Sequence, residues 1–470
     1  MAKAASSPVT NRDHGNSEQK LPALRLNNPA VQIILITICL FCNPGLYASI
    51  TASPFPENEV FVFSSFLASS LINVLGPRFT VCIGVTGYPL YTGAMWYYDV
   101  TGRIWYPIFA GAYLGVSAGC LWTTASYMAN TYPEEKDKGM WRAIQWTGNL
   151  LGATVGGCIA LGINWNAKST GVPHSLYIIF VILACCSLLF GTMILPPAKL
   201  IRSDGTHIAE FKPISMKASI IETAKTFTDP IMIIMLPVAF IPEMFMPLQS
   251  SMNAYAYNLR TRSLNNLLNN VTQIPTVIGC GLLLDNKKLR RKTRAFIAIT
   301  IIMIWVTGSY VAQTIWLSSW KFNRHIPGPS IDITDAAYPG AVIIYLFYGG
   351  QYGMFQNTVV WIIGSLTNDP RRISHLSGIF VGLLSAGTAI SFGCDATAQP
   401  YENENAAFFA LTMLCWPSLY YVVWKYMKDT NYFLEENVIV PIHARKQLQV
   451  HMEETGQTLE IENDHPDRKM

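Results

Sequence analysis

Charge is what this sequence has least of. Only 13% of its 470 residues are Asp, Glu, Lys or Arg, whereas a soluble domain carries about 25%. Hydrophobic residues make up 51% of the chain. A soluble chain of this length needs more charge to cover its surface, but a surface that faces lipid does not. The composition therefore predicts a polytopic integral membrane protein, with the lipid bilayer as its most extensive partner.

Several common signals are missing, and each absence narrows the function. The ten cysteines form no CxxC pair and no ligand spacing with histidine, so we expect neither a metal site nor a disulfide framework. The sequence contains no G-x-S-x-G, H-E-x-x-H or Walker motif, which argues against an enzyme and against direct use of ATP. We expect no cofactor. The first 20 residues are polar, so we also expect no cleaved signal peptide.

The formal net charge of +4 does not indicate nucleic acid as a partner. The basic residues are scattered over short loops and form no stripe with interleaved aromatic residues.

Twelve apolar segments are long enough to cross a bilayer as helices, which requires about 20 residues each. The second is the shortest, because Pro54 and Pro56 prevent its extension toward the N-terminus. The predicted spans are 30–50, 59–75, 79–98, 105–129, 140–163, 174–196, 229–257, 264–284, 294–317, 337–365, 375–394 and 404–427.

Lys and Arg are distributed unequally over the loops between these spans. The loops that follow even-numbered spans hold 15 of them, and the loops that follow odd-numbered spans hold 6. By the positive-inside rule the first set faces the cytosol, so both termini are predicted to be cytosolic. The most basic stretch is GLLLDNKKLRRKTR at 281–294, in which six of the last eight residues are Lys or Arg.

The chain divides near its middle, where the longest internal polar segment separates two sets of six spans. This plan is typical of transporters built from two similar halves. Glycines spaced four apart in the fourth and fifth spans have counterparts in the tenth and eleventh, which also indicates a repeat. The predicted parts are a disordered cytosolic N-terminus at 1–29, a six-helix half at 30–196, a cytosolic linker at 197–228, a six-helix half at 229–427 and a disordered cytosolic tail at 428–470.

One acidic residue lies deep inside a predicted span. Glu243 is roughly 20 Å along the helix of the seventh span, near the middle of the bilayer, where a charge is expensive. Pro237, Pro242 and Pro247 surround it and are expected to break the helix, as occurs where a helix lines a cavity. We interpret Glu243 as a proton or substrate group. The alternative is a neutral structural residue held by hydrogen bonds.

Amide side chains at membrane depth extend this candidate cavity. The tenth span contains YGGQYGMFQNTVVW, whose glycines, aromatics and amides suit recognition of a neutral or amphipathic solute. Each amide alone is more often part of an interhelical hydrogen bond than of a binding site. The predicted cavity residues are Glu243, Gln249, Asn253, Gln351, Gln356, Asn357 and Asn149.

Asp285 lies at the cytosolic end of the eighth span. The helix dipole disfavours a carboxylate at a helix C-terminus, so we expect a cation beside it that latches neighbouring helices. The alternative is that the basic loop serves membrane topology alone. The predicted cytosolic gate consists of Arg78, Asp285, Lys288, Arg291 and Arg294.

Segments spread along most of the chain resemble one family. The Gly…Asp…Arg/Lys pattern after the second and eighth spans is similar to that of the major facilitator superfamily, and the full set resembles the fungal branch of the Unc-ninety-three-like family. The segments are NPGLY at 43–47, NVLGPR at 73–78, TYPEEKDKG at 131–139, NLRTRSLNNLL at 258–268, LLDNKKLRRKTRA at 283–295, SLTNDPRRISHLSG at 365–378 and SAGTAIS at 385–391. The resemblance implies an all-α fold of twelve transmembrane helices, whose two six-helix halves rock against each other.

Two functions fit these features. The first is a secondary transporter that moves a small solute by alternating access without ATP hydrolysis, with the proton as a candidate coupling ion. The alternative is a non-transporting scaffold that regulates or escorts a partner membrane protein or ion channel, as animal members of the resembled family do. The eleventh span lacks the Lys and Arg common in that family, which weakens an anion-binding role there. A cavity reaching Glu243 favours transport, and a collapsed apolar centre favours the scaffold.

Overall fold

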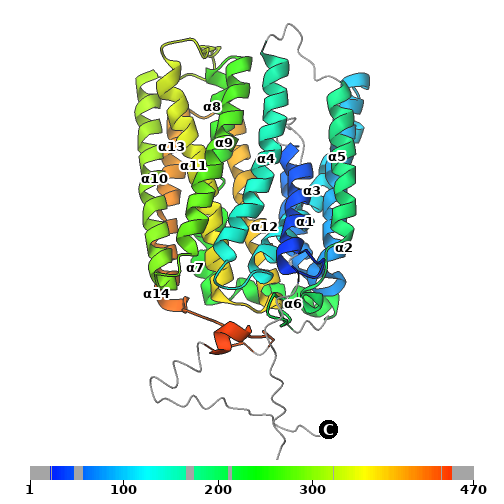
Figure 1. Ribbon diagram of the computed structural model, residues 1–470. Helices are drawn as coiled ribbons and strands as arrows, with labels where there is room; N and C mark the ends of the chain where they lie inside the picture. The colour runs from blue at the N-terminus through cyan, green and yellow to red at the C-terminus, as the bar shows by residue number, and fades with distance from the viewer. Residues whose placement is uncertain are drawn as a thin grey trace, which may run out of the picture.

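The structure is a computed structural model that describes residue 22 and residues 24–46, 57–165, 174–209, 214–320, 322–435 and 437–446. Within these residues all extended elements are helices, accompanied by three isolated β-bridges. The helices stand side by side as a bundle, and both ends of the described chain lie at the same end of it (Figure 1). This arrangement agrees with the predicted all-α class.

Nine helical stretches of the described chain are long and apolar enough to cross a membrane. Six are single helices. One, α2, consists of two consecutive helices joined at a kink, and two are pairs of helices separated by a short break. They are α2 (Glu57–Thr101), α3 (Trp105–Thr131), α4 (Lys138–Asn164), α5 (His174–Thr192), α7 with α8 (Pro230–Phe240 and Phe245–Ala256), α9 (Leu259–Leu284), α10 (Arg291–Trp320), α12 (Pro370–Ala396) and α13 with α14 (Tyr401–Met413 and Cys415–Tyr426).

Three further helices complete the bundle and its edge. The short apolar helix α1 (Pro29–Leu40) continues into a π-helical turn at Phe41–Gly45. The helix α11 (Tyr338–Leu366) has the length of a span, but its glycines and amides lower its hydropathy, and most of its C-terminal half is buried. The helix α6 (Met216–Phe227) lies outside the membrane-spanning set, within the polar segment between the halves.

The stretch α2 contains two of the predicted spans, 59–75 and 79–98. Gly76 lies between them with φ 82° and ψ 165°, a conformation that side chains with a Cβ atom rarely adopt. Pro77 follows, and its fixed φ suits the first turn of a new helix. The chain therefore changes direction at Gly76, and α2 consists of two consecutive helices.

The seventh predicted span is broken, as its prolines indicated. The helix α7 ends at Phe240, α8 begins at Phe245, and Pro242 and Glu243 lie in the turn between them. Proline cannot donate the backbone hydrogen bond that a continuous helix needs at this point. The break holds Glu243 on irregular backbone inside the bundle, an arrangement tolerated where such backbone lines a cavity.

The buried apolar side chains form two main clusters. One is built from residues between 33 and 209, joined by Ile373. The other is built from residues between 232 and 427. Each cluster lies between helices of one part of the chain, so most core packing is local to the first or the second half of the sequence.

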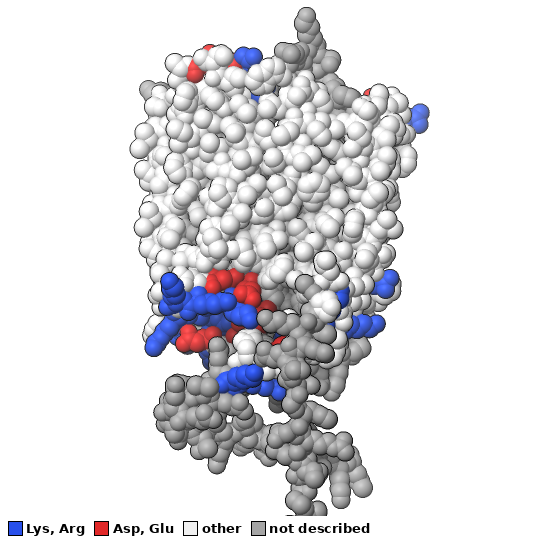
Figure 2. All heavy atoms as spheres, in the orientation of Figure 1, with Lys and Arg blue, Asp and Glu red and all other residues white. Residues whose placement is uncertain are grey.

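Charged residues gather at the ends of the bundle and leave its side wall almost free of them (Figure 2). We call the end with the loops 132–137, 285–290 and 367–369 the charged face. The linker helix α6 also lies there and packs against α2 and α12. Its Thr223 hydroxyl forms hydrogen bonds with Ser69 at 3.1 Å and with His375 at 2.8 Å. An apolar wall with charged ends is what a helical bundle needs in a bilayer.

The chain continues in contact with the bundle beyond the predicted boundary at 428. The backbone N–H of Asn431 donates to Glu135 at 2.8 Å, and Val438 forms a β-bridge with Ala209. The stretch NYFLEENVIV at 431–440 is more apolar than the final 20 residues on which the prediction of a disordered tail rested. Residues 447–470 of that tail and residues 1–21 of the predicted N-terminal tail lie outside the described residues.

Candidate functional site

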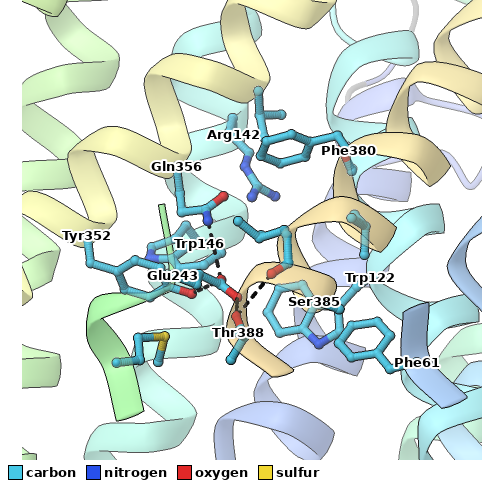
Figure 3. A pocket seen from close by; sticks show the side chains of 15 residues that line it. Phe61, Trp122, Arg142, Trp146, Glu243, Tyr352, Gln356, Phe380, Ser385 and Thr388 are labelled. Carbon is cyan, nitrogen blue, oxygen red and sulfur yellow. Dashed lines mark hydrogen bonds between the residues drawn. The ribbon is translucent and has the colours of Figure 1, made fainter. Parts of the chain in front are cut away.

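A cavity of about 220 Å³ lies inside the bundle, between helices from both halves of the sequence (Figure 3). It is lined by Phe61 on α2; Trp122 and Ser126 on α3; Arg142 and Trp146 on α4; Glu243 and Met246 at and after the α7–α8 break; Tyr352, Gln356 and Val360 on α11; and Phe380, Val381, Leu384, Ser385 and Thr388 on α12.

Glu243 is the acidic residue of this cavity, and hydroxyl and amide donors hold its carboxylate in place. The hydroxyl of Tyr352 donates to Oε1 at 2.5 Å, and Nε2 of Gln356 donates to the same oxygen at 3.3 Å. The hydroxyl of Thr388 donates to Oε2 at 3.2 Å. Three donors from two helices can accommodate a charged carboxylate at a depth where water is scarce.

Arg142 brings a positive charge to the same cavity from the other half. It is 3% exposed, and Nη1 donates to Oε1 of Gln145 at 2.6 Å. Its guanidinium also lies over the ring of Trp146, 5.1 Å from the ring centre. None of the ion pairs formed by described residues includes Arg142. In Figure 3 its side chain reaches into the cavity above Glu243.

Aromatic rings form much of the remaining wall. Trp146 packs against Trp122 with ring centres 5.9 Å apart and against Tyr352 at 5.4 Å. The indole N–H of Trp146 on α4 donates to Gln273 of α9 at 3.3 Å, which fixes the ring against α9. These rings provide apolar faces, while their polar atoms are occupied by protein partners.

Two of the seven predicted cavity residues, Glu243 and Gln356, line this cavity. The side-chain amide of Gln249 instead donates to Gln313, and the side-chain oxygen of Asn253 accepts from Asn265 at 2.9 Å. These side chains belong to a separate polar cluster between α8, α9 and α10. Their direction depends on how α8 is rotated after the break, which the spacing in the sequence did not reveal.

The other three predicted residues also lie away from the cavity. Gln351 borders a separate void of about 20 Å³ beside Pro242. Asn357 is buried, and the backbone of Asn149 packs against Gly45 of the π-helical turn.

Most of the cavity wall was not found from the sequence. Trp122, Trp146 and Thr388 carry no signal that separates them from ordinary packing residues of apolar helices. Arg142 does carry one, because an ionisable residue inside the predicted span 140–163 is unusual at membrane depth. Its closeness to the start of that span made it look like part of the preceding basic loop.

Asp285 is held at the charged face by backbone donors, and of the predicted cations Arg294 adds an electrostatic attraction that opposes the rise of its pKa. Its carboxylate accepts from the N–H groups of Gly139 at 2.9 Å and Met140 at 2.6 Å, at the beginning of α4. Burial raises the pKa of Asp285 to about 6, although the two backbone hydrogen bonds oppose that rise. A helix N-terminus offers free N–H groups and a positive dipole, so it can replace a basic side chain.

The predicted gate cations therefore have other positions. Arg78 and Lys288 are exposed. Arg291 pairs with Glu135 at 2.9 Å, and Arg294 donates to the carbonyl oxygen of Leu284 at 2.7 Å.

Glu135 and Lys138 join helices from the first and second parts of the sequence at the charged face. Glu135 forms its ion pair with Arg291 of α10, and Nζ of Lys138 donates to the carbonyl of Gly364 at 2.6 Å and to Asn368 at 2.9 Å. Burial alone would raise the pKa of Glu135, but Arg291, Lys138 and two hydrogen bonds outweigh it, so the pKa is lowered. These groups hold the ends of α4, α10 and α11 together below the cavity.

Comparison with known proteins places the chain among multi-pass membrane proteins. The profile of a family described as "Ion channel regulatory protein UNC-93" matches residues 57–285. An uncharacterized membrane protein of Schizosaccharomyces pombe is 33% identical over 402 residues, which cover 82% of this chain and 82% of the relative. UNC93-like protein 1 of Arabidopsis thaliana is 29% identical over 450 residues, which cover 90% of this chain and 96% of the plant protein.

A relative from a filamentous fungus is also similar along most of its length. The notoamide biosynthesis cluster protein O' of Aspergillus versicolor is 26% identical over 397 residues, which cover 80% of this chain and 86% of that protein.

Solved structures of the major facilitator superfamily share the fold. The proton:xylose symporter XylE, bound to 6-bromo-6-deoxy-D-glucose, aligns with a TM-score of 0.56 at 12% identity, over 85% of this chain and 95% of the symporter. The Escherichia coli fucose:proton symporter FucP aligns with a TM-score of 0.54 at 13% identity, over 86% of this chain and 98% of the symporter. At such low identity the likeness concerns the fold and not the solute.

Proposed function

The chain belongs to the Unc-93-like family, and from this premise we propose that it is a secondary transporter that moves a small solute across the membrane by alternating access. The family and the fold are those of membrane transporters and regulators, not of enzymes. The observation that carries the proposal is the cavity that holds Glu243 and Arg142 between helices of the two halves. A collapsed apolar centre would have no room for a solute.

The proposed architecture has twelve transmembrane helices in two six-helix halves. In support, Gly76 divides α2 into two helices, and α11 has the length of a span although it is less apolar. The separate hydrophobic clusters of the two halves fit units that move as rigid bodies. In such transporters the solute binds between the halves near the middle of the membrane.

The cavity wall is divided between the halves in a way that suits this motion. Arg142 and Trp146 come from the first half, while Glu243, Tyr352 and Thr388 come from the second. A solute that touches both sets draws the halves together, and its binding free energy can favour one arrangement over another. The volume of about 220 Å³ is smaller than the 300–1,000 Å³ typical of sites for drug-sized ligands. The proposed solute is therefore small.

Glu243 is the proposed coupling group. Protonation would remove its charge and turn one oxygen from an acceptor into a donor, so its hydrogen bonds to Tyr352, Gln356 and Thr388 would have to rearrange. These partners lie on α11 and α12. A proton at Glu243 would thus change how the α7–α8 break is attached to its neighbours.

The charged face is the proposed cytosolic gate. By the positive-inside rule, its excess of Lys and Arg supports a cytosolic location for this face and for both termini. The hydrogen bonds of Asp285 to α4 and the ion pair of Glu135 with Arg291 join the proposed halves there. These contacts have to break before the cavity opens to this side. Arg78 and Lys288 are exposed nearby as candidate partners for another arrangement.

Solute-dependent proton movement in proteoliposomes tests the proposal. Protein with Glu243→Gln is compared with wild type and with Glu402→Gln, which changes an exposed acid in the first turn of α13. A panel of small metabolites is added while a pH-sensitive dye reports the interior. We expect a signal in wild type and Glu402→Gln that is absent in Glu243→Gln. Solute uptake that persists unchanged in Glu243→Gln would keep transport but remove Glu243 as the coupling group.

A regulatory scaffold is the second candidate, and the description of the matching family as ion channel regulators supports it. The same measurement separates the two functions. If folded wild-type protein moves neither solute nor protons across the whole panel, the scaffold becomes the better reading. Co-purification of a channel or another membrane protein with the full chain would then identify its partner.

A further inference from the structure

Resting on this proposed function, we infer that the solute is a small organic monocarboxylate, and that Arg142 is the residue that recognises its carboxylate. The inference concerns the central cavity and depends on three properties of its wall: a buried cation that has no acidic partner, a carboxylate that is already supplied with donors, and a set of aromatic faces.

The cation has no acidic partner of its own. An arginine side chain stays charged under all ordinary conditions, because its pKa exceeds about 12. Arg142 is nevertheless 3% exposed, and its Nε atom is buried without a hydrogen-bond partner among the described residues. The oxygen of Gln145 and the ring of Trp146 stabilise it only in part. An unpaired charge at this depth is costly, and an anion that enters the cavity would reduce that cost.

Glu243 does not serve as that anion. It lines the same cavity, yet none of the ion pairs between described residues includes Glu243 or Arg142. Both of its oxygens already accept hydrogen bonds, from Tyr352 and Gln356 on one side and from Thr388 on the other. The two opposite charges are therefore held apart, and the cavity lies between groups that can take different parts of a solute.

The geometry of the cation and of the wall limits the kind of anion. A guanidinium presents a planar fork of donors that matches the two oxygens of a carboxylate. Arg142 is the only Lys or Arg among the residues that line the cavity in the described part of the chain, so a dianion would bring an uncompensated negative charge into an apolar site. Trp122, Trp146 and Phe380 offer apolar faces to the rest of the solute. These features favour a monocarboxylate with a small apolar or aromatic body.

Equilibrium binding to purified full-length protein tests this inference without requiring transport. Radiolabelled benzoate is the probe, and its competitors are unlabelled benzoate, benzamide and benzyl alcohol, which share the ring and differ in charge. Butyrate and butyramide form a second, aliphatic pair. A hydrogen bond to a charged group contributes about 1.5–3 kcal/mol, so we expect each acid to bind roughly tenfold or more tightly than its amide.

Variants assign the preference to Arg142. Arg142→Gln is expected to lose the difference between acid and amide, while Arg142→Lys keeps a positive charge and is expected to keep part of the difference. Arg103→Gln changes an exposed arginine outside the cavity and is expected to behave like wild type. Size-exclusion profiles and thermal unfolding confirm that each variant is folded. Because Arg142→Lys preserves the charge, it remains informative if Arg142→Gln does not fold.

Equal binding of acids and amides by wild type, no binding of any acid in the panel, or an undiminished preference in folded Arg142→Gln overturns the inference. Its failure is distinct from failure of the transport proposal. Uptake of a neutral solute without preference for acids would retain transport and remove the carboxylate. Binding of benzoate with the predicted dependence on Arg142, but without uptake of any solute, would retain the carboxylate site and remove transport.

Discussion

Glu135→Gln is expected to destabilise the protein strongly, because Glu135 belongs to a buried ion pair at the charged face. Glu135 is 7% exposed, and it pairs with Arg291, which is 3% exposed, at 2.9 Å. The carboxylate also accepts from Nδ2 of Asn368 at 2.6 Å and from the N–H of Asn431 at 2.8 Å. All of its close partners are donors. A glutamine in this place offers one acceptor oxygen, and its NH₂ group faces donors.

The magnitude follows from what the substitution leaves behind. Without Glu135, Arg291 keeps a hydrogen bond from Nη1 to the carbonyl of Lys428 at 3.4 Å, and its Nε atom has no partner among the described residues. Removing one member of a buried ion pair typically costs about 3–5 kcal/mol, because the other charge stays buried. The double variant Glu135→Gln with Arg291→Gln removes both charges. It is therefore expected to be more stable than Glu135→Gln alone.

The neighbouring Glu134 provides a matched control. It pairs with Lys136 at 2.7 Å, but these side chains are 17% and 41% exposed. Glu134 also lies 3.6 Å from His443. Ion pairs that solvent can reach contribute at most about 1 kcal/mol. Unfolding by SDS in mixed micelles, followed by tryptophan fluorescence, measures the free energy of unfolding of each variant. If Glu135→Gln and Glu134→Gln differ by less than about 1 kcal/mol, the buried pair does not hold this face together and the reasoning is refuted.

Two further predictions use the same unfolding assay. Gly364→Ala is expected to lower the free energy of unfolding by about 1–3 kcal/mol, since a Cβ atom there would lie 2.2 Å from Oδ1 of Asn130. At Gly340 on the same helix a Cβ atom would meet nothing within 4 Å, so Gly340→Ala is expected to be neutral or slightly stabilising. Equal effects of the two substitutions would contradict the close approach at Gly364. Asp285 has a pKa raised from 3.8 to about 6, so the folded state binds a proton there more tightly than the unfolded state does. Protonation of Asp285 therefore stabilises the folded protein fully below about pH 4, and this stabilisation is lost as the pH rises through 6. Wild type is therefore expected to gain about 1 kcal/mol relative to Asp285→Asn when the pH falls from 7 to 5, and an unchanged difference would contradict the raised pKa.

Local composition determined the membrane class and much of the helix pattern. Long apolar runs with few charges predict spanning helices because the bilayer core penalises any unpaired polar group. The break at Glu243 was also predictable, since a proline removes a backbone donor wherever it stands in a helix. The kink that divides α2 likewise depends on two neighbouring residues, Gly76 and Pro77. The segments that resemble the Unc-93-like family led to the correct family because they are distributed over most of the chain.

The tertiary structure decided which side chains meet. Successive residues of a helix point about 100° apart, so the rotation of α8 after the break turns Met246 into the cavity and Gln249 into another cluster. Arg142 and Glu243 are 101 positions apart along the chain, and their shared cavity depends on how the two halves are docked. Asp285 likewise accepts its hydrogen bonds from backbone donors at the start of α4, while Arg294 acts on it through its charge. Such contacts depend on the relative placement of helices that are distant in sequence, and periodicity within one helix carries no information about it.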